Sequence, residues 1–357
     1  MKPGLVPGFV AAAPGQAPLV SAGYESLYFK VLQAGSIMRF SAAAMLLSCM
    51  AVQGAYARPH GSGQKIPSSA SSRAAPHDPF RMPESERRNI AENPSWTAPQ
   101  KPFRIYGNTW YVGPRGLGVF LITAPTGDVL IDGGVPGDAP LIEANIRTLG
   151  IALHDIQWIL NSHAHSDHAG DIARLAHDTG AQVIANSADA PLLERGGHDD
   201  LQYGDRFPFP PVHVARTVTD GERLQLGDLV LTAHATPGHT PGNTTWTWTS
   251  CKGTRCMHVV DVGSLSAPGF RLVGDPGIVK QFERSFEAVA ALPCDIPIAP
   301  HPEMVDFWAR VAKRERGDAN AMVDPAGCRA YANAARERFE AELAKQRAEA
   351  APKQKLP

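Results

Sequence analysis

Short apolar runs rich in β-branched and aromatic residues alternate with amphipathic segments along most of the chain. The apolar runs are broken by Gly, Pro or Asn, a pattern that is typical of β-strands. The amphipathic segments carry apolar residues three and four positions apart, which indicates helices. Strands are expected at residues 109–113, 118–124, 128–134, 156–162, 182–187, 229–236, 244–250, 257–263 and 295–300, and helices at 139–150, 169–181, 279–292 and 324–345.

The predicted elements follow the same order twice, with strands first and helices after them. Because a sheet and an amphipathic helix must each bury an apolar face, this order predicts an α/β fold in which two β-sheets pack face to face, with helices on both outer faces. We expect this domain at residues 81–345 and a C-terminal tail at residues 346–357.

The first 57 residues are the least globular part of the chain. A basic residue follows Met38, an apolar stretch comes next, and a small-x-small pattern ends at Ala57. This pattern predicts a secretory signal peptide that begins at about Met38 and is cleaved after Ala57. A short buried helix is one alternative, and lipidation of Cys49 in a segment that loosely resembles a bacterial lipobox is another. Residues 58–80 are rich in Ser, Gly, Pro and His and are expected to form a flexible leader.

The composition is that of an ordinary globular protein, with 43% hydrophobic and 19% charged residues among 357 and a formal net charge of -1. Basic residues are scattered, so the chain has no electrostatic footprint for nucleic acid. No apolar run approaches the roughly 20 residues that a membrane span needs. We therefore expect neither a nucleic-acid partner nor membrane attachment of the mature chain.

Export would place the mature chain in the periplasm, an oxidising compartment. Removal of Cys49 with the signal peptide leaves four cysteines: Cys251, Cys256, Cys294 and Cys328. An even count in such a compartment favours two disulfides, and four reduced, buried thiols are the alternative. Cys251 and Cys256 flank the turn-like segment KGTR, so a hairpin disulfide is the simplest local pairing, although spacing alone does not choose among the three pairings.

Metal-competent side chains are concentrated in the segment ILNSHAHSDHAGD at residues 159–171, which ends a predicted buried strand. Residues two apart on an extended backbone point to the same side, so the imidazoles of His163 and His165 can converge on one ion. Asp167 and His168 lie beyond the bend and can face a second ion. Neutral imidazoles with a carboxylate suit Zn²⁺, whose catalytic sites keep an open position for water.

Two further histidines follow predicted strands. His239 is flanked by glycine-containing turns, and His301 lies between two prolines. Histidines supplied at three separate strand ends predict a two-metal site at one edge of the sheets. The remaining histidines, such as His154, His213, His234 and His258, are assigned no metal role.

The H-x-H-x-D-H motif, the downstream His239 and His301, and an early IDGG segment resemble the metallo-β-lactamase superfamily over about residues 100–345. The resemblance implies an αβ/βα four-layer sandwich with the metal site at one edge of the two sheets. The segment GSLSAPGF is similar to that of subclass B3 metallo-β-lactamases. The chain departs from the subclass pattern at Pro114 and Gly118, where Thr and Ser are common, which puts the detail of that loop in doubt.

The subclass resemblance assigns roles to individual residues. Two zinc ions per chain are implied, together with contacts to the carboxylate of the drug and a second disulfide. The implied ligands are His163, His165 and His239 for the first ion and Asp167, His168 and His301 for the second, the implied drug contacts are Ser264 and Ser266, and the implied disulfide joins Cys294 and Cys328.

The resemblance implies hydrolysis of the β-lactam amide bond of penicillins, cephalosporins and carbapenems, and hence antibiotic resistance. Two zinc ions lower the pKa of a shared water to near neutrality, so that hydroxide attacks the small-molecule substrate without a protein base. Asp167 is the residue expected to act in catalysis, because it tethers the second ion and orients the nucleophile.

Two other functions stay open. The first is a different hydrolase of the same fold, such as a glyoxalase II-like thioesterase or an acyl-homoserine lactonase, which uses a bridging aspartate. Asp261 follows His239 by 22 residues, but the resemblance places Ser264 at the bridging position, so Asp261 is expected to be structural. The second is a zinc-binding or adhesive protein without catalysis. It would need closed coordination, whereas six ligands shared by two ions leave positions for water.

Overall fold

The structure is a computed structural model that describes residues 78–351. The predicted signal peptide with its cleavage after Ala57, the alternative lipidation site at Cys49 and most of the leader at residues 58–80 lie outside the described residues. Within the described part, no helix is both long enough and apolar enough to cross a membrane.

The first sheet has seven strands in the order in which they follow one another along the chain. The first four strands pair antiparallel, and the last three join the sheet in parallel. The strands are β1 (Phe103–Tyr106), β2 (Thr109–Tyr111), β3 (Phe120–Ile122), β4 (Asp128–Ile131), β5 (Ile156–Leu160), β6 (Gln182–Asn186) and β7 (Arg216–Val218).

The second sheet has five strands in the order β12-β11-β10-β9-β8. Its long β-hairpin strands are antiparallel, and β12 lies parallel to β11 at one edge. The strands are β8 (Arg223–Leu226), β9 (Leu229–Ala235), β10 (Thr244–Lys252), β11 (Arg255–Asp261) and β12 (Ile296–Ile298). The sequence pattern does not predict β1, β7 or β8, because each is a short edge strand with a single fully buried side chain.

Alternating side chains of the first sheet divide between two apolar cores. Val129 and Ile131 of β4 pack between the two sheets, against residues of the second sheet such as Trp246, whereas Leu130 faces the opposite way. Leu130 packs with Ile142 beneath the outer helices. Because side chains alternate across a strand, a sheet buried on both faces reads as a nearly continuous apolar run. The predicted arrangement of two packed sheets between helices is confirmed.

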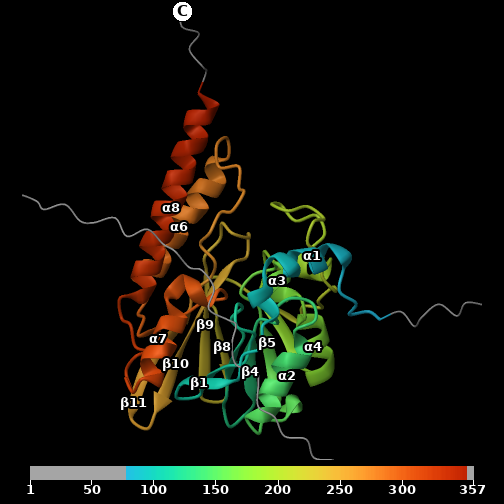
Figure 1. The fold of residues 1–357 in the computed structure, drawn as a ribbon, viewed down its shortest axis with the longest axis vertical. Helices are drawn as coiled ribbons and strands as arrows, with labels where there is room; N and C mark the ends of the chain where they lie inside the picture. The colour runs from blue at the N-terminus through green and yellow to red at the C-terminus, as the bar shows by residue number, and fades with distance from the viewer. Residues whose placement is uncertain (1–77, 352–357) are drawn as a thin grey trace, which may run out of the picture. The chain divides into compact units, whose positions relative to one another are not determined.

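Helices cover the outer face of each sheet (Figure 1). Helices α2 and α4 lie over the first sheet, and the orange to red helices α6, α7 and α8 lie beside the second sheet. The phenylalanines of α6 pack against Phe339 of α8, with ring centroids 4.8 Å apart for Phe282. The helices are α1 (Glu84–Glu92), α2 (Ala139–Thr148), α3 (Ser166–Ala169), α4 (Ile172–Thr179), α5 (Ala190–Glu194), α6 (Pro276–Ala291), α7 (Phe307–Glu315) and α8 (Gly327–Ala350).

Three helical segments differ from the expectation. The helix predicted at residues 169–181 is the shorter α4, and the short helix α3 before it was not expected. Helix α8 continues to Ala350, so the end predicted at residue 345 was wrong and residues 346–350 are helical. Helix α1 was not expected, because its only buried side chain is the polar Glu86.

Two disulfides are present in the structure. Cys251 and Cys256 join the paired ends of β10 and β11, and Cys294 is bonded to Cys328 across 34 residues. The second bond ties the start of α8 to the segment that precedes β12.

Candidate metal centre

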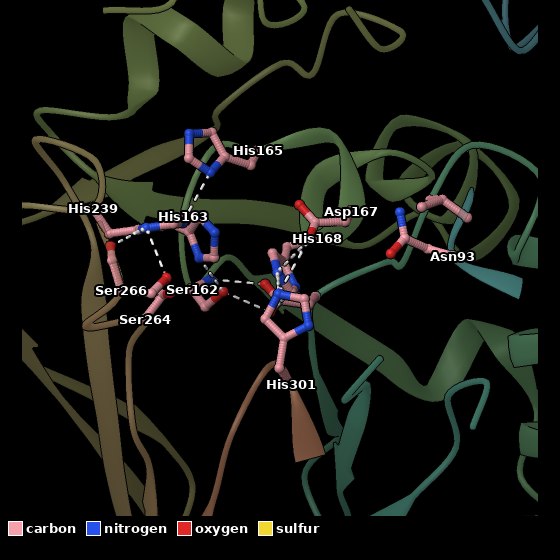
Figure 2. A network of polar contacts seen from close by, with 12 residues as sticks. Asn93, Ser162, His163, His165, Asp167, His168, His239, Ser264, Ser266 and His301 are labelled. Carbon is pink, nitrogen blue, oxygen red and sulfur yellow. Dashed lines mark hydrogen bonds and ion pairs between the residues drawn. The ribbon is translucent and has the colours of Figure 1, made fainter. Parts of the chain in front are cut away.

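The predicted ligand residues meet at one edge of the two sheets. His163, His165, Asp167 and His168 follow the end of β5, at the point where the parallel strand runs into α3. Different loops carry the other two histidines: His239 follows β9 and His301 follows β12. Figure 2 shows that the six side chains form two groups, one around His239 and one around His301.

The first group consists of His163, His165 and His239, each of which offers one ring nitrogen within 4.8 Å of those of the other two. Nδ1 of His165 and Nε2 of His239 are 3.1 Å apart. Nε2 of His163 is buried and has no hydrogen-bond partner among the described residues. A buried polar atom without a partner costs about 1–3 kcal/mol, so these nitrogens are arranged to bind a common ligand.

The second group consists of Asp167, His168 and His301. Oδ2 of Asp167 lies 3.2 Å from Nε2 of His168 and 3.2 Å from Nε2 of His301, and the two imidazole nitrogens are 3.3 Å apart. His163 also lies within 4.8 Å of Asp167 and His168, so the two groups adjoin. Each of the two adjoining groups of nitrogen and carboxylate donors could hold a metal ion.

The carboxylate of Asp132 contacts His168 of the second group directly and His163 of the first group through Ser162. Its carboxylate accepts hydrogen bonds from the hydroxyl of Ser162 at 2.6 Å and the backbone N–H of Ser162 at 2.7 Å. The same hydroxyl lies 3.2 Å from Nδ1 of His163, and Oδ2 of Asp132 lies 3.7 Å from Nδ1 of His168. The contact with Ser162 orients the imidazole of His163 and leaves its Nε2 free to bind, whereas the contact of His168 is longer than a hydrogen bond.

The imidazoles of His165 and His239 also have polar neighbours outside the group of ligands. Nδ1 of His239 lies 2.8 Å from the backbone oxygen of Ser266, and Nε2 of His165 lies 3.6 Å from a carboxylate oxygen of Asp200. Asp132 comes from the IDGG segment, but no local signal in the sequence indicates the part that Asp200 plays, because it lies 35 residues after His165.

The electrostatics favour the ligand forms of His163, His239 and Asp167. Burial lowers the pKa of His163 well below its usual range, and the neighbouring imidazoles lower it further. The pKa of His239 is lowered to about 3, by burial first and then by the proximity of His165. Burial acts to raise the pKa of Asp167, yet the imidazoles of His168 and His301 hold it well below its usual range. Burial acts to lower the pKa of His301, yet the neighbouring Asp167 raises it. Neutral imidazoles and an ionised carboxylate are the forms that bind a cation.

Ser264 and Ser266 adjoin the first group (Figure 2). Their hydroxyl oxygens are 3.2 Å apart, and Oγ of Ser266 lies 3.4 Å from Nδ1 of His239. The backbone of Ser264 is held by Asn243, whose side chain accepts from its N–H and donates to its carbonyl oxygen. The two hydroxyls are therefore placed on a fixed backbone next to the imidazole cluster.

A cavity of about 1060 Å³ includes side chains of both groups in its wall. Trp96 packs near His301 with ring centroids 6.0 Å apart, and Tyr203 packs against His165 at 5.1 Å. The loop at residues 197–207 and helix α8 supply much of the remaining wall, with Phe207 and Phe339 among its members. These residues of the cavity wall could not be predicted from the sequence, because they come from segments that carry no motif.

Asp261 belongs to neither group of candidate ligands. It is 1% exposed, and neither carboxyl oxygen has a hydrogen-bond partner within the part of the chain that the structure describes. Burial and the charge of Asp132 raise its pKa well above its usual range. Asp261 is thus a core residue at the end of β11. His154, His213, His234 and His258 also lie outside both groups.

Comparison with known proteins places the chain in a family. The family model described as Metallo-beta-lactamase superfamily matches residues 113–301, more than half of the chain. The solved structure of the Rm3 metallo-beta-lactamase is 45% identical, covers 71% of this chain and 97% of its own, and has a TM-score of 0.68. BJP-1, a subclass B3 metallo-beta-lactamase of Bradyrhizobium japonicum, is 39% identical over 72% of this chain and 98% of its own, with a TM-score of 0.68.

Curated relatives match over shorter stretches. A hydroxyacylglutathione hydrolase of Anaeromyxobacter dehalogenans (strain 2CP-C) is 33% identical over 117 residues, which is 31% of this chain and 38% of that protein. The chain thus spans well under half of that relative. The chain belongs to the metallo-β-lactamase superfamily, and subclass B3 metallo-β-lactamases are among the solved structures that it matches over nearly their full length.

Proposed function

We propose that the protein is a zinc-dependent β-lactamase that hydrolyses the amide bond of penicillins, cephalosporins and carbapenems, and that it confers resistance to them. The observation that carries this proposal is the alignment with subclass B3 metallo-β-lactamases over nearly their whole length, 98% in the case of BJP-1. The two serines beside the imidazole cluster support it further, because a β-lactam of these classes carries a carboxylate next to its ring nitrogen.

Two zinc ions fit the donor atoms that the chain offers. We assign His163, His165 and His239 to the first ion, since Nε2 of His163 is buried and has no other partner among residues 78–351. The second ion is assigned to Asp167, His168 and His301, whose facing atoms lie 3.2–3.3 Å apart. When bound, zinc supplies Lewis acidity and lowers the pKa of water towards neutrality.

The chain's own groups bind and orient the substrate. The hydroxyls of Ser264 and Ser266 donate hydrogen bonds to the carboxylate of the β-lactam and so direct its amide towards the two groups of ligands. Asp167 accepts a hydrogen bond from the attacking water, because its carboxylate is ionised and faces the space between His168 and His301. Trp96 and Tyr203 line the cavity beside these groups and supply apolar surface next to the polar contacts.

A thioesterase activity on hydroxyacylglutathione is the second candidate, because the curated relatives with that name match 31–44% of this chain. Against it, the expected bridging carboxylate is absent from the two ligand groups, since Asp261 lies apart from both. Ser264 lies near the imidazoles instead.

We further propose that the protein is periplasmic. The disulfides Cys251–Cys256 and Cys294–Cys328 support an oxidising compartment. Mature protein isolated from a bacterial periplasm should begin at or near Arg58 by intact-mass measurement. Retention of residues 1–37, or a diacylglyceryl group on Cys49, would show that the signal-peptide proposal is wrong.

A substrate panel tests the function. Purified protein is given a penicillin, a cephalosporin, a carbapenem, a monobactam and S-D-lactoylglutathione, each with and without EDTA and with clavulanate as an inhibitor of serine enzymes. We expect EDTA-sensitive, clavulanate-resistant hydrolysis of the first three and two zinc ions per chain. Hydrolysis of the thioester alone would identify the second candidate, and bound zinc with no hydrolysis would identify a binding protein.

A further inference from the structure

Two arginines line the cavity beside the metal-ligand groups and form no ion pair with any carboxylate in the described part of the chain: Arg206 and Arg338. We propose that they form a cationic subsite at the mouth of this cavity, and that this subsite binds an anionic group on the acyl side chain of the substrate. The proposal rests on the β-lactamase function proposed above and names the substrates that this function favours.

The cavity has room for such a side chain. Its volume of about 1060 Å³ is at the upper end of the ~300–1,000 Å³ range of small-molecule sites. The buried ligand residues and Ser266 occupy one part of its wall, and the loop at residues 197–207 and helix α8 occupy another. A β-lactam nucleus held at the metal-ligand groups therefore directs its substituents towards the loop and the helix.

The charged side chains of the cavity wall other than Arg206 and Arg338 lie near a partner in the described chain. Asp167 and Asp200 face the imidazoles of His168 and His165, and Glu342 lies 3.5 Å from the ammonium of Lys345. The two arginines are the charged residues of the wall that form no ion pair among the described residues, and both side chains are exposed. Within the described part of the chain no carboxylate pairs with either guanidinium, so both are available to an anionic ligand.

Each guanidinium is held by a fixed support. That of Arg206 lies 4.9 Å from the centre of the Phe207 ring. Phe207 packs on Tyr203 at 5.2 Å, and Tyr203 packs on His165 at 5.1 Å, so an aromatic wall runs from the first ligand group to Arg206. An arginine that stacks on an aromatic face keeps its N–H donors free, so the guanidinium of Arg206 stays available to a ligand.

Arg338 is supported by helix α8. The next residue, Phe339, is buried and packs on Phe282 of α6, with ring centroids 4.8 Å apart. The disulfide from Cys328 anchors the start of the same helix. A guanidinium offers paired donors that match a carboxylate or sulfonate. The carboxylate beside the β-lactam ring nitrogen is assigned to the serines, so the group recognised here is a second anion on the side chain.

Two penicillins that differ by one carboxylate test the proposal: benzylpenicillin and its α-carboxylated form, carbenicillin. We expect Arg338→Gln to raise the KM for carbenicillin about fivefold more than the KM for benzylpenicillin, as for a solvent-exposed charge pair. Arg206→Gln should act in the same direction. In the unsubstituted protein, added salt should weaken any preference for carbenicillin over benzylpenicillin, measured as the ratio of their KM values, since salt screens exposed charges.

Arg336→Gln is the matched control, because Arg336 lies on the same helix, pairs with Glu287 at 3.9 Å and is not in the cavity wall. It should leave both KM values unchanged. An equal rise for both penicillins in Arg338→Gln would place the guanidinium on the shared ring carboxylate and overturn the proposal, and so would no change in either KM. Failure of the unsubstituted protein to hydrolyse either penicillin would instead refute the proposed function itself, together with this inference.

Discussion

The hydroxyl of Thr240 donates a hydrogen bond of 2.6 Å to Oδ2 of the buried Asp189. The same oxygen accepts from the backbone N–H of Ala164 at 3.0 Å, so one carboxylate joins the loop of His163 and His165 to the loop of His239. The three members of the first ligand group are therefore held together by a residue that binds no ligand itself.

Asp189→Asn should weaken this connection, because an amide nitrogen cannot accept the hydrogen bonds that Oδ2 now receives. We expect the affinity for zinc at the first site to fall about 10–100-fold, the usual effect of losing an outer contact of a metal ligand. Competition with a chromophoric chelator measures it. Thr240→Val removes one of these hydrogen bonds and should have a smaller effect. Unchanged zinc affinity in Asp189→Asn would mean that the loops are held by other contacts.

Asp167→Ala should remove the carboxylate from the second ligand group and leave His168 and His301 as its remaining members. We expect zinc content to fall from two towards one per chain, with a severe loss of turnover, because that ion and the oriented water are both lost. Metal analysis and steady-state hydrolysis give the two readouts. Hydrolysis at the rate of the unsubstituted protein would contradict the ligand assignment.

Ser264→Ala with Ser266→Ala should weaken substrate binding more than the chemical step. Hydrogen bonds to a charged group contribute about 1.5–3 kcal/mol, so KM should rise about tenfold or more while kcat changes less. The backbone of Ser264 keeps its bonds to Asn243, so the segment should stay in place. A collapse of kcat with unchanged KM and lost zinc would make this segment part of the metal site.

The disulfide between Cys294 and Cys328 closes 34 residues. Replacing both cysteines with alanine should lower the free energy of unfolding by about 3–4 kcal/mol in the chain-entropy model. Loss of the Cys251–Cys256 bond, which closes only 5 residues, should cost less. Chemical denaturation of the two double variants compares them. The reverse order would show that chain entropy is not the dominant effect.

The carboxyl of Asp138 should make stability depend on pH. Burial raises its pKa from 3.8 to about 8, against the hydrogen bond from the N–H of Val135. Because the folded chain holds this proton more tightly than the unfolded chain, the contribution is fully present below pH 3.8 and is lost as the pH rises to about 8, on the order of 1 kcal/mol per pH unit.

Asp138→Asn should therefore flatten the fall of the unfolding free energy between pH 5 and 8, since an amide accepts from Val135 without ionising. Denaturant titrations of both proteins at several pH values measure the slopes. Identical slopes would show that Asp138 ionises in the folded chain as it does in the unfolded one.

The layered fold and the part of the site that lies within residues 163–168 could be predicted from the sequence. Val129, Leu130 and Ile131 follow one another as a buried strand must, because side-chain direction alternates with period two. His163, His165, Asp167 and His168 lie within six positions of one chain segment, so their convergence at a strand end follows from short-range geometry alone. His239 and His301 were predicted from their positions after two other strands, and the resemblance to a known family then implied which ion each of them binds.

The residues from distant parts of the chain that surround residues 163–168 are set by tertiary packing. Asp189 and Asp200 lie tens of residues from the histidine segment that they contact, and Arg338 reaches the cavity because α8 packs on α6. The edge strands β1, β7 and β8 likewise escaped prediction, since edge strands bury few side chains and leave a weak pattern. A sequence pattern records which faces of an element are buried, whereas the identity of the neighbour on each face is set by packing between elements far apart in the chain.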